Sequence, residues 1–375
     1  MPLIILILFT GILLTVRLRG LQIRHLGKAL HYVFHNEDDG EGEVTSFGAL
    51  CTALSATIGT GNIVGCATAI VAGGPGALFW MWLAAFFGMA TKYAEGMLAV
   101  KYRVIAEDGH ALGGPFYYIE KGMGKNFKWL AKLFCVFGTM VGLFGIGTFT
   151  QVNGITSAVN NFFDPSNVHT ISLFGMNYSI SVVVAGIIVT ICAGLVIIGG
   201  IKRISKVSEV IVPFMAVTYI GVCLIIVFTH LPQVPAAFAE IVQSAFGLKA
   251  VAGGAIGAMT VAMQKGIARG IFSNEAGLGS APIAAAAAQT NEPVRQGLVS
   301  MTGTFIDTII VCTMTGLAIV MTGAWDMGLE GVAVTTKAFA LGLPFPAKAS
   351  AIILMMCLVF FAFTTILGWA YYSER

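Results

Sequence analysis

Residues 55–65 read SATIGTGNIVG, in the middle of the run 48–72, which is apolar and long enough to cross a membrane. Glycine tolerates positive φ and loses more backbone entropy in a helix than other residues, so Gly59, Gly61 and Gly65 allow the helix to unwind there. Unwound backbone at membrane depth needs protein cover, a wet cavity or a ligand. A small-residue face packed against another helix would explain this stretch equally well.

The composition is that of an integral membrane protein. Of the 375 residues, 57% are hydrophobic and only 10% are charged, whereas soluble domains carry about 25% charged residues. Apolar runs long enough to span a bilayer recur between short polar stretches, so we expect an all-α polytopic protein with about nine transmembrane helices. The expected spans are 2–16, 48–72, 76–100, 131–160, 178–199, 209–229, 254–289, 298–322 and 349–372.

Lysine and arginine predict the orientation, because basic loops stay on the cytoplasmic side. Most of the 21 basic residues fall in alternate loops, which predicts an extracytoplasmic N-terminus and a multi-pass protein of a cell (plasma) membrane. This asymmetry accounts for the net charge of +3, so the charge gives no reason to expect nucleic acid as a partner.

A second interruption lies at residues 266–282, GIARGIFSNEAGLGSAP. We expect Pro282 and the alanine run 284–288 to continue the helix beyond it. Two glycine-interrupted helices far apart in the sequence are typical of transporters with inverted repeats and a substrate site at the membrane midplane. An interrupted helix has free N–H groups at the N-terminus of one half-helix, which favour an anion, and free carbonyls at the C-terminus of the other, which favour a cation. Such a site can bind both charges of a zwitterion.

Several strings together resemble the alanine or glycine:cation symporter family, the sodium:alanine symporters: GTGNIVG, GGPGALFWMW, GMATKYAEG, GGPFYYIEKGM, GGIKRISKVSE and RGIFSNEAGLGSAP. The resemblance runs from end to end. It implies a leucine-transporter-type inverted-repeat fold with an extra N-terminal helix, in a prokaryotic membrane. The domains would be an N-terminal helix with a basic segment (1–47), a first five-helix repeat (48–229) and a second repeat (230–375). Family members continue past GWAYYSE, so we expect a C-terminally truncated second repeat.

The resemblance implies import of small neutral amino acids such as alanine and glycine, coupled to sodium, with no other cofactor. The substrate carboxylate would lie at Thr60, Gly61 and Asn62, facing Phe272, Ser273 and Asn274. Gln151 is either a substrate contact or a helix–helix hydrogen bond. Trp369, one turn after Thr365, either lines the site or belongs to an interfacial aromatic belt.

Sodium prefers several oxygen ligands. Thr364 and Thr365 are adjacent hydroxyls in an apolar run, and Phe361 offers a carbonyl one turn earlier; the threonines would otherwise bond to their own helix. The resemblance implies that the ion bridges these groups to carbonyls near Ser55 and Ile58.

Charges inside spans need partners. Lys92 and Glu95, three residues apart, either pair with each other or leave Glu95 to cap the first interruption. We expect Glu275 and Asp307 to be structural, and Arg269 is a candidate gate residue.

Other functions remain as alternatives: a proton-coupled amino-acid transporter of the same fold, an inactive fragment, a channel or a membrane enzyme. An enzyme is disfavoured, because the histidines lie in loops or at a span end and form no metal-binding pattern at membrane depth. A channel is disfavoured because no repeated carbonyl filter sequence is present.

Overall fold

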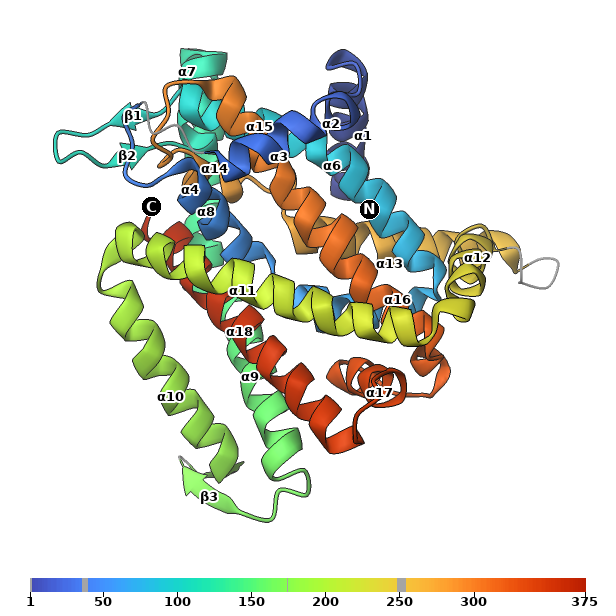
Figure 1. The fold of residues 1–375 in the computed structure, drawn as a ribbon. Helices are drawn as coiled ribbons and strands as arrows, with labels where there is room; N and C mark the ends of the chain where they lie inside the picture. Colours follow the sequence, from blue (N-terminus) through green and yellow to red (C-terminus); the bar gives the residue numbers. More distant parts are fainter. Residues whose placement is uncertain (1, 36–39, 174, 248–253) are drawn as a thin grey trace.

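The computed structural model describes residues 2–35, 40–173, 175–247 and 254–375, and helices make up most of them (Figure 1). The first interrupted helix begins at α4, where the N-cap Thr45 Oγ1 accepts from Gly48 N at 2.8 Å. It continues through a π-helical turn into α5, and the two arms meet at a bend of 52°. The elements up to residue 101 are α1 (Pro2–Arg17), α2 (Leu21–Arg24), α3 (Leu26–Phe34), α4 (Ser46–Thr57), η1 (Gly61–Gly65), α5 (Cys66–Gly73) and α6 (Gly76–Lys101).

The middle of the chain holds two short antiparallel hairpins and the most exposed helices. In the second hairpin Thr170 pairs with Ser179. Beside it Val168 N, His169 N and Ser179 Oγ donate to the Asp164 carboxylate, and these hydrogen bonds, that of Val168 first, hold the pKa of Asp164 below its usual range. The elements are β1 (Val104–Ile105), β2 (Ala111–Leu112), α7 (Pro115–Met123), η2 (Lys125–Phe127), α8 (Lys128–Leu143), α9 (Ile146–Phe163), β3 (Thr170–Leu173), β4 (Met176–Ser179), α10 (Ile180–Ile197) and α11 (Gly200–Thr229).

The second interrupted helix opens the last part of the chain. The expected helical continuation through 284–288 is wrong: α14 ends at Ala285, and Ala288 instead forms a parallel bridge with Val44. The elements are η3 (Leu231–Gln233), α12 (Val234–Ala245), α13 (Ala255–Asn274), α14 (Ala281–Ala285), α15 (Pro293–Thr304), η4 (Phe305–Cys312), α16 (Thr313–Met321), η5 (Ala324–Asp326), α17 (Val332–Gly342) and α18 (Ala347–Glu374).

Within the described residues, five helical stretches are long and apolar enough to cross a membrane, or six if the bent pair α4 and η1–α5 counts as one span. The expected count of nine is therefore not confirmed. Among the expected spans that fall short, α1 has only 16 residues, and α6 and α13 carry lysine and many small residues. The five are Lys125–Phe163, Ile180–Ile197, Gly200–Thr229, Pro293–Met321 and Ala347–Glu374.

The apolar core surrounds the first interruption. Ile58 and Phe361 are fully buried in one cluster with Tyr219 and Phe339, which joins α4, α11, α17 and α18. Helix α10, in contrast, exposes large apolar side chains such as Ile187 and Leu195. Such an apolar outer face fits contact with lipid, and the chain is a polytopic helical membrane protein by composition and span length.

Candidate functional site

The first interruption frees backbone groups that two side-chain amides satisfy. After α4 ends, Ile58 turns to an extended conformation with ψ 93°. Gly59 N then donates to Asn62 Oδ1 at 2.9 Å, and Thr60 N donates to Gln151 Oε1 on α9 at 3.1 Å. Asn62 is fully buried and Gln151 is nearly so. These bonds meet the requirement that backbone freed at membrane depth finds a partner.

Helix α18 lies tightly against this interruption. Thr365 Oγ1 is 3.3 Å from Ile58 O and 3.0 Å from Phe361 O, and its hydroxyl donates to these carbonyls. A Cβ on Gly59 would stand 2.4 Å from Thr365 Oγ1, so any larger residue here would force Thr365 to shift. Three of the five expected sodium ligands, Ile58, Phe361 and Thr365, are thus in direct contact.

The other two expected sodium ligands bond mainly within their own helices. Thr364 Oγ1 donates to Phe360 O at 3.1 Å and to Phe361 O at 3.0 Å, and it lies 3.4 Å from Met215 Sδ on α11. Ser55 Oγ donates to Thr52 O at 2.7 Å. Both hydroxyls are fully buried, but the described hydrogen bonds do not join Ser55 to the group around Thr365.

Charged side chains hold the second interruption. Helix α13 ends at Asn274, and Glu275 follows with φ 56° in the left-handed region. Lys92 Nζ on α6 donates to Asn274 O at 2.8 Å, and Gly279 N donates to Glu95 Oε1 at 3.2 Å. Ser280 Oγ donates to the Glu275 carboxylate.

Among the described residues, no ion pair within 4.0 Å joins Lys92 to Glu95, although the charge of Lys92 acts on the Glu95 carboxylate. The hydrogen bond of Glu95 is with Gly279 N, at the second interruption and not at the first. The physical reason is that α6 packs along α13, so side chains from its middle reach the carbonyl and N–H groups left free where α13 stops.

Asp307 connects the two interruptions. It lies on the π-helix η4, is fully buried, and accepts from three side chains. Asn62 Nδ2 donates to Oδ1 at 2.7 Å, and Ser273 Oγ donates to Oδ2 at 2.9 Å. Thr308 Oγ1 also donates to Oδ2, at 2.6 Å, and Asn274 Nδ2 donates to Thr308 Oγ1 at 3.0 Å. One carboxylate thus binds a residue from each interrupted helix.

The remaining expected site residues each have their own neighbours. Gly61 faces Ser273, whose Cα would be 3.9 Å from a Cβ on Gly61. The Phe272 ring is half exposed and lies 5.8 Å from the Arg269 guanidinium. Trp369 packs so closely on α9 that a Cβ on Gly147 would be 2.1 Å from its ring.

A small hollow lies beside α4 and is lined by residues of α4, α6, α14 and α15, among them Ala53, Thr57, Lys92, Ala285 and Ser300. Sequence reasoning did not single out this hollow or Thr308. Thr308 stands next to Asp307 in the apolar run FIDTIIVC, and a second polar residue there is the signal that could have drawn attention to it.

The comparisons with known proteins agree on one family. The model of the sodium:alanine symporter family matches residues 1–375. An uncharacterized transporter of Haemophilus influenzae is 58% identical over 376 residues, covering all of this chain and 78% of that protein. The sodium/alanine symporter AgcS of Methanococcus maripaludis is 46% identical over 380 residues, covering 99% of this chain and 79% of that protein. The probable sodium/glutamine symporter GlnT of Bacillus subtilis is 40% identical over 375 residues, covering 99% and 73%.

Proposed function

Because the chain belongs to the sodium:alanine symporter family, a family of transporters and not of enzymes, we propose that it imports small neutral amino acids, alanine and glycine, together with sodium by alternating access. In the proposed architecture, 48–229 and 230–375 are two inverted repeats of a leucine-transporter-type fold that follow an N-terminal segment, 1–47. The N-terminus would be extracytoplasmic. The two interruptions, each on a different proposed repeat, support this assignment.

The observation that carries the proposal is the chemistry of the first interruption. The N–H groups of Gly59 and Thr60 bond to neutral amide oxygens of Asn62 and Gln151. A substrate carboxylate is a stronger acceptor than an amide oxygen, and it would arrive at the N-terminal end of the turn that starts at Gly61, where the backbone dipole favours an anion. Thr60, Gly61 and Asn62 would therefore bind the carboxylate.

The other side of the proposed site comes from the second interrupted helix. Ser273 lies against Gly61, and we expect backbone carbonyls around Ser273 to accept from the substrate ammonium, since Asn274 O already accepts from Lys92. Phe272, Thr365 and Trp369 would complete the wall, and their bulk favours a small substrate side chain. Arg269 beside Phe272 is the proposed gate residue.

Sodium would bind on the α18 side of the first interruption. Ile58 O, Phe361 O and Thr365 Oγ1 already converge there. The hydroxyls of Thr364 and Ser55 would supply further oxygen ligands. Binding a cation between Ile58 O and Thr365 would brace the unwound backbone that also receives the substrate. Ion and substrate would thereby favour the same arrangement, which is thermodynamic coupling.

The test is uptake of labelled alanine by the purified protein in liposomes, with sodium or choline outside. We expect saturable uptake that requires sodium and is inhibited by excess glycine. Uptake indifferent to sodium would overturn the proposal; dependence on a proton gradient alone would favour a proton-coupled transporter. Non-saturating flux would favour a channel. Glutamine as competitor tests the wider substrate named for the Bacillus subtilis relative.

A further inference from the structure

Two segments that flank the interrupted helices meet away from the proposed substrate site. Residues 40–44 precede α4, and residues 286–291 follow α14. Glu43 N and Val44 N donate to Ala287 O at 2.8 and 3.1 Å, and Gln289 N donates to Val44 O at 2.8 Å. We call this pairing the flank junction. Figure 1 shows that it lies on the same side of the molecule as the β1–β2 hairpin and the C-terminus.

The two backbones of the flank junction approach as closely as they can. A Cβ on Gly40 would be 2.5 Å from Asn291 N, and a Cβ on Gly42 would be 2.4 Å from Ala288 O. Neither space accepts a side chain, because real Cβ atoms do not come this close to backbone. The glycines therefore permit the pairing of the two flanks.

Arg103 holds both flanks at once. It lies two residues after the end of α6, and its Nη1 donates to Ala286 O at 2.9 Å and to Ala288 O at 2.6 Å. Its Nη2 donates to Thr290 O at 2.8 Å and also to Glu41 O on the other flank. The planar guanidinium fork presents several fixed donors, which a lysine ammonium cannot match.

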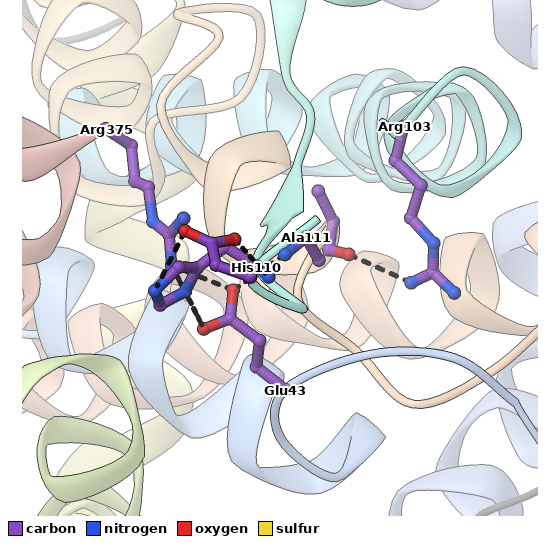
Figure 2. Close-up of polar contacts among 7 residues, drawn as sticks. Glu43, Arg103, His110, Ala111 and Arg375 are labelled. Carbon is purple, nitrogen blue, oxygen red and sulfur yellow. Dashed lines mark hydrogen bonds and ion pairs between the residues drawn. The ribbon is translucent and has the colours of Figure 1, made fainter. Parts of the chain in front are cut away.

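Glu43 ties two more elements to the same place (Figure 2). Its carboxylate accepts from Ala111 N of the hairpin at 2.9 Å and from Arg375 Nη2 after α18 at 2.8 Å. The ring of His110 lies 2.8 Å from Glu43 Oε2. The Glu43 side chain is only 3% exposed, so these partners enclose it.

We propose that Arg103 is a positioning residue that joins the start of α4 to the end of α14, the helix ends farthest from the two interruptions. We further propose that transport requires the flank junction to separate. This inference rests on the proposed function. The hollow beside α4, lined by Ala53 and Ala285, lies between the same two helices. Separation of the flanks would open that hollow to the side that the basic loops predict to be cytoplasmic.

The first experiment measures access to the hollow. A reporter cysteine, Ala53→Cys, is labelled with a membrane-impermeant maleimide applied from the predicted cytoplasmic side, and the chain without the reporter gives the background from its native cysteines. We expect Arg103→Gln to speed labelling about tenfold, because loss of charge-assisted hydrogen bonds shifts the equilibrium toward the separated state. Arg103→Lys should restore part of the slow labelling.

Arg203→Gln is the matched control. Within the described part of the chain, Arg203 on α11 donates to one carbonyl, Leu195 O on α10 at 2.8 Å, and the basic loops place it on the same side. Equal labelling rates for Arg103→Gln and Arg203→Gln, in proteins with equal thermal stability, would overturn the proposal. This readout needs no uptake, so it is separate from the test of symport itself.

The second experiment locks the flank junction and does not depend on removing Arg103. Val44 and Ala288 are bridge partners, and directly paired positions lie within reach of a disulfide. We expect oxidised Val44→Cys/Ala288→Cys protein to stop alanine uptake and reduction to restore it, while each single variant transports in both conditions. Undiminished uptake by the cross-linked protein would show that the flanks need not separate. If the unmodified protein itself shows no sodium-dependent uptake, the proposed function fails instead.

Discussion

At the first interruption, neutral amides of Asn62 and Gln151 satisfy the freed backbone, whereas at the second the ammonium of Lys92 and the carboxylate of Glu95 do so. Hydrogen bonds to charged groups are about twice as strong as neutral ones. The second interruption is therefore braced, while the first is held by contacts that a charged ligand can replace.

The backbone of the two interruptions differs in the same sense. Only Ile58 to Thr60 separate α4 from the π-helical turn, and the chain resumes at once. Glu275 to Ser280 separate α13 from α14, with φ values of 56°, 87° and 79° at Glu275, Gly277 and Gly279. A six-residue segment with three left-handed residues needs strong partners to keep one conformation. We infer that the second interruption keeps its conformation during transport while the first interruption changes its contacts.

The largest expected effect is on stability and comes from the second interruption. Lys92→Met would leave Asn274 O without its donor and remove the positive charge that acts on the buried carboxylates of Glu95 and Glu275. We expect a loss of unfolding free energy of about 3 kcal/mol or more, as when one member of a buried charge network is removed. Thermal unfolding of the purified protein in detergent measures it.

Lys101→Met is the matched control for Lys92→Met, because Lys101 is the exposed last residue of the same helix. Equal melting temperatures of the two variants would remove the contrast between a charge-braced and a neutral interruption.

The next effect falls on the first interruption. Gly59→Ala places a Cβ 2.4 Å from Thr365 Oγ1, and overpacking of this kind costs about 2 kcal/mol. Because the strained group is the proposed sodium site, we expect the half-saturating sodium concentration of uptake to rise about thirtyfold. Gly65→Ala is the control in the same turn, since the nearest atom would be 3.8 Å away. If both variants keep the parent's sodium response, Thr365 does not serve the ion.

The sequence alone predicts the positions of the two interruptions and two of the polar residues that bond to them. The glycines within 59–65 and those at 277 and 279 predict where the two helices are interrupted, because glycine permits such backbone. Gln151 and Asp307 stand out as polar residues in apolar runs, where each needs a partner. The structure gives them partners at the first interruption.

The rest depends on packing between distant elements. Lys92 bonds to Asn274 O on α13, and Glu95 accepts from Gly279 N. The three-residue spacing of Lys92 and Glu95 along α6 does not predict either partner. Ala286 to Ala288 have high helix propensity, yet they leave the helix because Glu43, Val44 and Arg103 donate to their backbone carbonyls. Helix propensity is a weak prior that tertiary contacts override. The short helices α12 and α17 were not predicted either, since neither is long enough to span a membrane.

Asp307→Asn tests the link between the interruptions. An amide offers one acceptor oxygen where the carboxylate offers two, so one of Asn62 and Ser273 would face an N–H group. Leaving such a buried donor unpaired costs about 1–3 kcal/mol. We expect weaker alanine binding by about tenfold, measured as the alanine concentration needed for thermal stabilisation. Asp326→Asn, at an exposed position, is the control; parent-like alanine binding by Asp307→Asn would mean that the two interruptions act independently.

The smallest effect separates two ways in which the first interruption can receive a carboxylate. Gln151 Oε1 holds Thr60 N, and the amide nitrogen of the same side chain remains a donor. If Gln151 stays and donates to the substrate, Gln151→Leu raises the half-saturating alanine concentration about fivefold, the value of one hydrogen bond of about 1 kcal/mol. We expect the opposite result, because in the proposed site the carboxylate replaces Gln151 at Thr60 N. Gln151→Leu then removes a competitor for that N–H and lowers the half-saturating alanine concentration about fivefold, with sodium dependence unchanged. Thr156→Val is the control, because its hydroxyl bonds to Val152 O in the same helix. A raised half-saturating concentration in Gln151→Leu would contradict the expectation, since it would mean that Gln151 keeps Thr60 N and donates to the substrate.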